Sequence, residues 1–237
     1  MRNTLAIAER ELKSYFVSPI AYVIGAAFLL IAGYLFSVIL LNTNEASLRY
    51  LISNLSVIWL FVAPFITMRL LAEEARTGTI ELLLTTPVRD IEVVLGKFVG
   101  ALLFVLALLV LTLYFPALLF VFGSPDVGPI ISGYLGVILQ AAAFLAIGLM
   151  VSSFTQNQIV AAFVTFAILL LMWLSESVAN FVGRPFGDIV RYLSVTSHFQ
   201  DFSRGVIDSS HVIYFLSIVA GALFITFLSL QTRRWRG

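Results

Sequence analysis

Ionisable side chains are concentrated in residues 69–97, a polar segment that lies between two long apolar runs. The segment holds five carboxylates and four basic groups: Glu73, Glu74, Glu81, Asp90, Glu92, Arg69, Arg76, Arg89 and Lys97. Such a mixture can form charge-assisted hydrogen bonds with a complementary surface. Because the segment is longer than a turn needs to be, and because topology requires only basic residues, we predict a docking surface. A solvated loop that only enforces topology is the alternative.

The chain shows no sign of catalytic chemistry of its own, and we assign no catalytic residue. Gly96 and Lys97 look like the end of a phosphate-binding loop, but Phe98 follows where Ser or Thr is needed, and Ile91 replaces the loop's first glycine. The chain therefore cannot hydrolyse ATP alone. The motifs HExxH and GxSxG, and the paired aspartates of intramembrane enzymes, do not occur in the sequence.

The composition defines the class of protein. Hydrophobic residues make up 60% of the chain and charged residues 11%, whereas a soluble domain carries roughly 25% charged residues. The mean hydropathy is +1.03. A bilayer core about 30 Å thick requires about 20 apolar residues in a helix. We therefore predict an all-α integral membrane protein, a single domain over residues 1–237, with six spans at 19–41, 51–68, 98–122, 130–154, 159–175 and 212–232.

The distribution of Lys and Arg predicts the orientation, because short cytoplasmic loops are enriched in both. If the amino terminus is inside, ten of the 14 basic residues lie on the cytoplasmic side and four lie outside. We expect both termini in the cytoplasm and the first span to act as a retained signal anchor. The chain has no cysteine, so disulfides are excluded, and its net charge of +1 gives no indication of a nucleic-acid partner.

Residues 3–17 predict an amphipathic helix before the first span. Its apolar residues recur at steps of three and four: Leu5, Ala8, Leu12, Tyr15 and Phe16. Such a helix lies along the inner headgroup layer. It either acts as an elbow that couples sideways forces to the first span or serves as a simple topogenic anchor.

Local chemistry divides residues 69–97 into short helices around a break. The second span can continue to Thr77, and Gly78 can stop it because glycine tolerates a left-handed backbone. Pro87 interrupts the next apolar stretch by removing an amide donor and restricting the residue before it. Asp90 is expected to cap the following helix, with Glu92 in its first turn.

Polar residues inside the spans are few. Gln140 lies within the fourth span and Glu176 at the outer end of the fifth, and both are candidates for a transport pathway or gate. The alternatives are that Gln140 bonds to a neighbouring helix and that Glu176 meets water near the interface. Pro64 and Pro116 are expected to mark kinks.

Residues 177–211 form the one long external segment that the sequence predicts. It contains His198, His211, Phe199 and Phe202 among several charged residues. Twelve residues separate the two histidines and there is no convincing third ligand, so we expect no metal site. An ordinary loop on the headgroups is one interpretation of this segment.

Three segments resemble ABC-2 type transporter permeases. The sequence EEARTGTIELLLTTPVRDIEVVLGK, residues 73–97, is similar to the cytoplasmic signature of that family. The likeness continues at SSFTQNQIVAA, residues 152–162, and at SVTSHFQDFSRGVIDSSHVIYF, residues 194–215. Among the branches of the family, the chain looks most like permeases associated with gliding motility or nitrous-oxide reductase maturation.

The resemblance implies a half-transporter with the fold of a type V exporter. Two such permeases, identical or different, would pair with two ABC ATP-binding subunits, and these partners would hold ATP and Mg. Residues 69–97 would then be the coupling element. Charge-assisted contacts to the ATP-binding subunit would come from Glu73, Glu74, Arg76 and Arg89, and the contact tip from Thr79, Ile80 and Glu81.

For the outer side, the resemblance implies short re-entrant or interfacial helices that cap the pathway. His198, Phe199 and Phe202 are the candidates for an external gate. Apolar, Phe-rich walls suit export of a hydrophobic, lipid-like or polymeric substrate, or transmission of force to an external partner protein, and they disfavour a hydrated ion. A membrane-embedded enzyme or a secondary transporter is the alternative. The expected location is the cytoplasmic membrane of a bacterium or archaeon.

Overall fold

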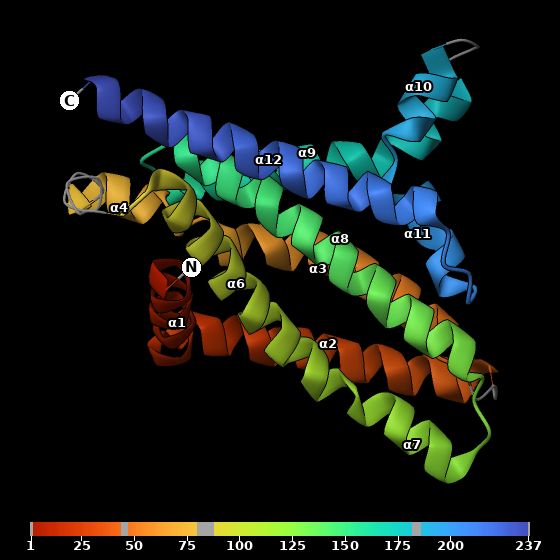
Figure 1. Ribbon diagram of the computed structural model, residues 1–237. Coiled ribbons are helices and arrows are strands. Elements are labelled where there is room, and N and C mark those ends of the chain that lie inside the picture. Colours follow the sequence, from red (N-terminus) through yellow and green to blue (C-terminus); the bar gives the residue numbers. More distant parts are fainter. Residues whose placement is uncertain (1, 44–46, 80–87, 182–185, 237) are drawn as a thin grey trace.

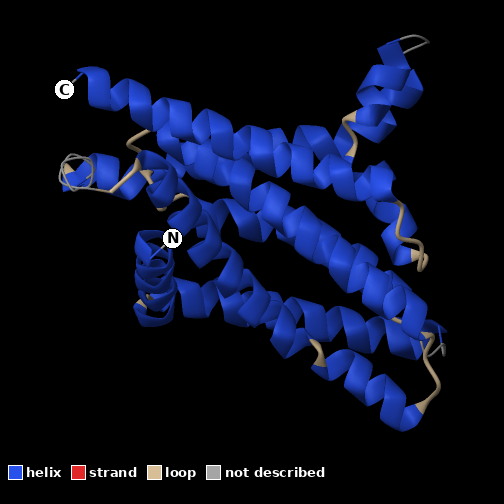
Figure 2. Cartoon of the chain, in the orientation of Figure 1, coloured by secondary structure: helices blue, strands red, loops and turns tan. Residues whose placement is uncertain are grey.

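The computed structural model describes residues 2–43, 47–79, 88–181 and 186–236, and every regular element in these ranges is a helix (Figure 2). The helices are α1 (Arg2–Val17), α2 (Pro19–Thr43), α3 (Arg49–Thr67), α4 (Ala72–Thr77), α6 (Asp90–Thr112), α7 (Tyr114–Phe122), α8 (Val127–Phe154), α9 (Gln158–Phe181), α10 (Phe186–Tyr192), α11 (Val195–Ser203) and α12 (Ser209–Arg236). The prediction of an all-α fold is confirmed.

Six helical stretches within the described ranges are long and apolar enough to cross a membrane. They correspond to α2, α3 with α4, α6 with α7, α8, α9 and α12, and each contains one of the six predicted apolar runs. The protein is therefore a multi-pass membrane protein. Both termini, α1 and α4 lie at one end of the bundle, and α11 lies toward the other (Figure 1).

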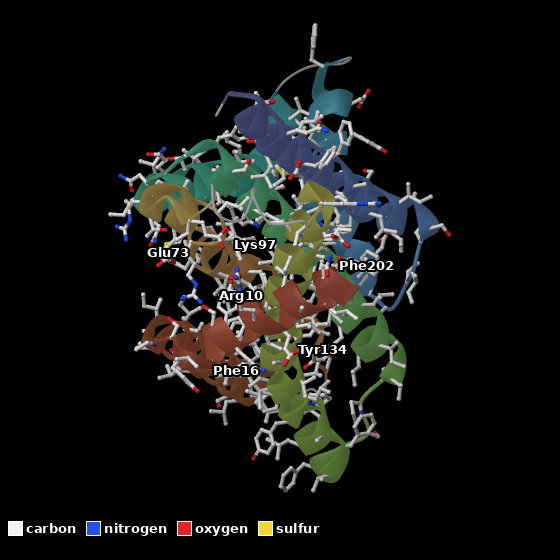
Figure 3. All side chains as sticks on the ribbon, turned by 60° about the vertical axis from the view of Figure 1, so that its left-hand side comes forward. Arg10, Phe16, Glu73, Lys97, Tyr134 and Phe202 are labelled. Carbon is white, nitrogen blue, oxygen red and sulfur yellow. The ribbon has the colours of Figure 1, made fainter. Side chains whose placement is uncertain are left out.

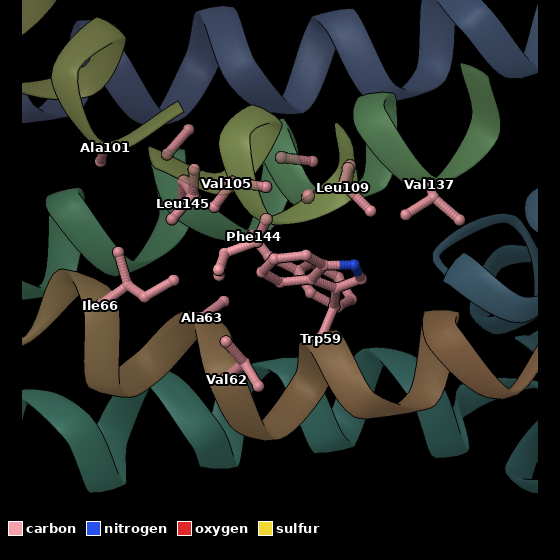
Figure 4. Packing of buried hydrophobic residues seen from close by; sticks show 14 of the residues in the cluster. Trp59, Val62, Ala63, Ile66, Ala101, Val105, Leu109, Val137, Phe144 and Leu145 are labelled. Atoms are coloured by element: carbon pink, nitrogen blue, oxygen red, sulfur yellow. The ribbon is translucent and has the colours of Figure 1, made fainter. Parts of the chain in front are cut away.

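Helices α3 and α8 form the centre of the bundle. Buried residues make up 78% of the central window of α8 but only 22% of that of α2, so α2 lies at the periphery. Trp59 of α3 and Phe144 of α8 are almost completely buried and lie together in the core (Figure 4). Phe28 of α2 packs against Trp59 with ring centroids 4.9 Å apart. Aromatic burial of this kind holds the peripheral helix to the centre.

The amino-terminal helix α1 packs across the start of α6. A Cβ added to Gly96 or Gly100 of α6 would lie 2.7 Å from side-chain atoms of α1, so the two glycines allow the close approach. As a result, part of the predicted apolar face of α1 packs against the protein and part of it is exposed. Ala8 and Tyr15 are buried against the protein, whereas Leu5 and Phe16 are exposed.

The third span is interrupted at Leu113, between α6 and α7. Pro116 causes the break because it has no amide to bond to the carbonyl of Thr112, four residues earlier, and because its ring crowds that carbonyl. The hydroxyl of Tyr134 on α8 donates to the Thr112 carbonyl at 3.0 Å. Pro64 also lies inside a helix, but α3 continues through it.

The short helix α11 lies toward the end of the bundle opposite the two termini (Figure 1). Ser194 caps α11 by accepting the amide of Ser197 at 3.3 Å. Phe202 of α11 lies over Gly136 of α8, where an added Cβ would be 2.6 Å from the Phe202 side chain. Ser132 of α8 donates to the Phe202 carbonyl at 2.8 Å. Helix α11 is therefore fixed to α8.

Candidate coupling site

The charged segment begins at a turn held by one serine. Helix α3 ends at Thr67 and α4 starts at Ala72 after an intervening turn, and the second spanning stretch continues through both helices to Thr77. Ser152 of α8 accepts the amides of Leu71 and Ala72 at 3.1 and 2.9 Å and donates to the Met68 carbonyl at 3.2 Å. A hydroxyl has one donor and two acceptor sites, so Ser152 uses its full capacity here.

Gly78 ends α4, as the sequence predicted. It adopts a φ of 71°, a left-handed conformation that suits glycine at a helix end. Arg89 rather than Asp90 precedes the first residue of α6, so the predicted capping role of Asp90 is wrong. The carboxylate of Glu92 instead folds back and accepts the Arg89 amide at 3.2 Å.

The predicted coupling residues separate into an outward and an inward group. Four of them are exposed to solvent: Glu73, Arg76, Thr79 and Arg89. Glu74 is half-buried and faces the protein. Ile80 and Glu81, the predicted contact tip, lie outside the described residues. Among the coupling residues that the structure describes, the outward group is the one available to a docking partner.

Glu74 belongs to a buried ionic cluster with Lys97, Glu11 and Arg10, which we call the Lys97 cluster (Figure 3). The Lys97 Nζ lies 2.8 Å from Glu74 Oε1 and 3.3 Å from Glu11 Oε2, and Lys97 is only 1% exposed. The guanidinium of Arg10, which is exposed, lies 3.5 Å from Glu74 Oε1. Nothing in the sequence indicates this pairing, because Glu11 and Lys97 are 86 positions apart.

A second contact joins α1 to the end of α3. Arg69 donates to Ser18 at 3.0 Å and to Ser14 at 3.3 Å, and its guanidinium lies 4.5 Å from the centre of the Tyr15 ring. The Tyr15 hydroxyl donates to the Ile66 carbonyl at 2.8 Å. Burial, aided by the nearby Glu11 carboxylate, raises the pKa of Tyr15, so the phenol remains a neutral donor.

The three predicted gate residues on α11 are buried. His198 lies beside Tyr214 and His211 of α12, and Phe202 lies beside His211. His198 stacks on Tyr214 with centroids 3.8 Å apart and lies 5.1 Å from the His211 ring. Burial lowers the pKa of His198 and the neighbouring His211 lowers it further, against the effect of a hydrogen bond with the Ser194 carbonyl. His211 Nε2 contacts Asp201 at 2.8 Å. Within the described ranges, no three His, Asp or Glu residues are grouped so as to hold a metal ion.

The two candidates within the spans lie in different settings. Gln140 is fully buried, and its amide donates to the Ser56 carbonyl of α3 at 3.2 Å. This contact is the helix-to-helix bond that was the alternative to a pathway role. Glu176 is half-buried near the outer end of α9. The structure therefore does not bring Gln140 to a surface of this subunit.

An apolar groove of about 800 Å³ runs between α2 and α3. Its lining is uncharged and includes Ile24, Ile31, Phe61 and Phe65, with Asn54 as one polar member. Phe61 and Phe65 also line a neighbouring hollow of about 220 Å³ beside Phe163 of α9. Together, α2, α3 and α9 present one continuous apolar concave face.

These features define a helical membrane protein with an exposed charged segment, α4 and the start of α6, at the end of the bundle that holds both termini. The family model for ABC-2 family transporter proteins matches residues 5–232, so the chain belongs to this family. It is a permease subunit of an ABC transporter, and the family implies an ATP-binding partner subunit. A comparison with curated proteins found no match.

Proposed function

We propose that this permease works as a dimer with two ATP-binding subunits, which dock on α4 and the start of α6. The observation that carries the proposal is the exposure of Glu73, Arg76 and Arg89 at one end of the bundle. Glu73 and Arg76 lie on α4, whose first residue is hydrogen-bonded to Ser152 of α8. ATP and Mg bind to the partner subunits. Closure of these subunits moves α4, and the movement passes to the spans.

The apolar face formed by α2, α3 and α9 is the proposed contact with the second permease and the wall of the pathway. A groove lined by Phe and Ile favours a hydrophobic, lipid-like or polymeric substrate, because a hydrated ion would lose its water shell there. The aromatic cluster of His198, Phe199 and Phe202 forms the outer gate. Export is the proposed direction of transport. The same movement of the spans could instead transmit force to an external partner protein.

The proposed setting is the cytoplasmic membrane of a bacterium or archaeon, with α1, α4 and both termini inside. The excess of Lys and Arg at that end supports this orientation. Residues 198–208, HFQDFSRGVID, support the branch associated with gliding motility or nitrous-oxide reductase maturation. The composition of the purified complex distinguishes a pair of identical permeases from a pair of different ones.

The docking proposal is tested by reversing outward charges on α4. The double variant Glu73→Lys/Arg76→Glu keeps the net charge, and neither residue takes part in the ion pairs of the Lys97 cluster. We expect the ATP-binding subunit that co-purifies with the wild-type permease from native membranes to be lost, because charge reversal at a contact opposes association. Co-purification is measured on the tagged permease.

Glu9→Lys is the matched control. Glu9 is exposed on α1 and pairs with Lys13 at 2.6 Å, outside the proposed docking element. Its reversal is expected to leave co-purification at the wild-type level. Retention of the partner by the double variant, or absence of any ATP-binding subunit in the wild-type preparation, contradicts the proposed function.

A further inference from the structure

We propose that Lys97 is a positioning residue that fastens α1, α4 and α6 into one rigid body, which carries movement of the docking element to the first span as well as to the second. The inference rests on the proposed function for the source of the movement. The fastening itself is a property of the permease alone. Its basis is one buried cation that contacts carboxylates from two other helices.

The burial of Lys97 is the first argument. Its Nζ approaches Glu74 of α4 and Glu11 of α1 within 3.3 Å or less, and the three side chains are all largely buried. A buried charge is tolerated only when it is paired, and removal of one partner leaves the other uncompensated. Separation of α1 or α4 from α6 would therefore expose or strand a charge, so the cluster resists relative movement of the three helices.

The packing around Lys97 is the second argument. Gly96 and Gly100 flank it on α6 and let α1 approach so closely that an added Cβ would lie 2.7 Å from Ile7 and Glu11. Close backbone packing leaves little room for sliding. Salt bridges and close packing therefore both restrain the crossing of α1 and α6.

The continuation of the chain is the third argument. Helix α1 ends at Val17 and α2 begins at Pro19, with Ser18 hydrogen-bonded to Arg69 after the end of α3. Movement of α4 reaches α3 directly through the turn at Ser152. The same movement reaches α2 through Glu74, Lys97 and α1. Since α2 and α3 form the two walls of the apolar groove, one docking element moves both walls.

The cluster also borders a polar hollow of about 320 Å³, lined by Arg10, Ser14, Arg69, Glu73 and other charged residues. Glu74 Oε2 is buried there and has no hydrogen-bond partner among the described residues. Glu74 is thus held only through its other oxygen. The strength of the fastening therefore depends on Lys97 more than on any other described contact of Glu74.

The fastening is tested with spin labels on the permease in nanodiscs. The chain has no native cysteine, so Ala6→Cys on α1 and Thr77→Cys on α4, both exposed positions, give one labelled pair. We expect a narrow distance distribution between the labels in the wild-type background and in Lys97→Arg, which keeps the charge. Lys97→Met is expected to broaden it.

Because Lys97→Met strands two carboxylates and can prevent folding, the decisive variant is Lys97→Met/Glu11→Met/Glu74→Met. This variant replaces all three charged side chains by apolar ones of similar volume, a change that is often neutral for a buried ion pair. It is expected to fold and to show the broad distribution. A distribution as narrow as the wild type in this variant overturns the proposal.

The functional arm uses the ATP-binding subunit that co-purifies with the wild-type protein. The triple variant is expected to retain this subunit, since Glu73 and Arg76 are unchanged. A lipid-like substrate is expected to stimulate ATP hydrolysis by the wild-type complex, and we expect this stimulation to fall about tenfold in the variant, a size typical of coupling between sites. Full stimulation in the triple variant contradicts the proposal. Absence of a co-purifying subunit contradicts the proposed function, while the label distances still decide the fastening.

Discussion

Ser152 shows how a single hydroxyl holds the turn that leads into α4. It accepts two amides and donates to one carbonyl at the turn between α3 and α4. Each group would otherwise be buried without a partner, because the turn interrupts the helical hydrogen bonds. The position of α4 relative to α8 therefore depends on one side chain.

We expect Ser152→Ala to destabilise the protein by about 1–3 kcal/mol, the cost of leaving buried polar groups unsatisfied. Thermal unfolding of the purified permease measures this change. Ser175→Ala is the matched control. Ser175 is also a buried serine, but its hydroxyl donates to the Met172 carbonyl within its own helix, so its loss should cost far less. Equal effects of the two substitutions would show that Ser152 has no special role.

Sequence patterns predicted residue roles well only where the role is local. Gly78 was assigned as a helix stop from its backbone freedom, and it has that conformation. Glu74 was assigned to the docking surface with Glu73, because nothing in the sequence shows that Lys97 lies beside it. Contacts between residues far apart in the chain depend on the arrangement of helices, which periodicity does not specify.

The crossing of α1 and α6 is the main relation between elements that the sequence did not predict. The pattern of apolar residues predicted α1 as a helix and suggested contact with headgroups. In the structure, Ala8, Glu11 and Tyr15 face the protein, whereas Leu5 and Phe16 are exposed. Tyr15 stacks on Phe104 of α6 with centroids 4.7 Å apart. The amphipathic pattern indicates which elements form but does not identify the surface that each apolar face meets.

The crossing predicts opposite effects for two identical substitutions. Gly100→Ala places a Cβ 2.7 Å from Glu11 Cβ, and we expect a net loss of about 1–2 kcal/mol from overpacking. Gly221→Ala on α12 has nothing within 4 Å and gains helix propensity, by up to about 1 kcal/mol. Thermal unfolding of both variants tests this difference. A stabilising Gly100→Ala would contradict the described crossing.

The number of membrane-spanning helices was the most predictable feature at the scale of the whole molecule. The six apolar runs all lie within helices, because the membrane requires long apolar segments with satisfied backbones. Pro116 predicted a kink in the third span, and the break lies at Leu113. The sequence did not predict the hydrogen bond from Tyr134 to the Thr112 carbonyl beside it. Which helices lie at the centre and which at the periphery was also unpredicted, because all six runs are similarly apolar.

Labelling of single cysteines tests the proposed orientation of the whole molecule. Thr77→Cys on α4 and Ser210→Cys on α12 introduce one thiol each, at exposed positions toward opposite ends of the bundle. In intact spheroplasts, a membrane-impermeant maleimide is expected to label Ser210→Cys but not Thr77→Cys, because the second thiol faces the cytoplasm. Inverted vesicles should give the reverse pattern. Labelling of Thr77→Cys from outside contradicts the orientation.

The buried lysine also bears on how the chain is made. Both acidic partners of Lys97 precede it in the polypeptide, so they have already been synthesised when the third span leaves the ribosome. In the proposed orientation, Lys97 stands at the cytoplasmic end of the third apolar span, where a basic residue favours retention of that end. Once α1 and α4 have docked, the same charge is neutralised. One residue thus serves insertion first and assembly afterwards.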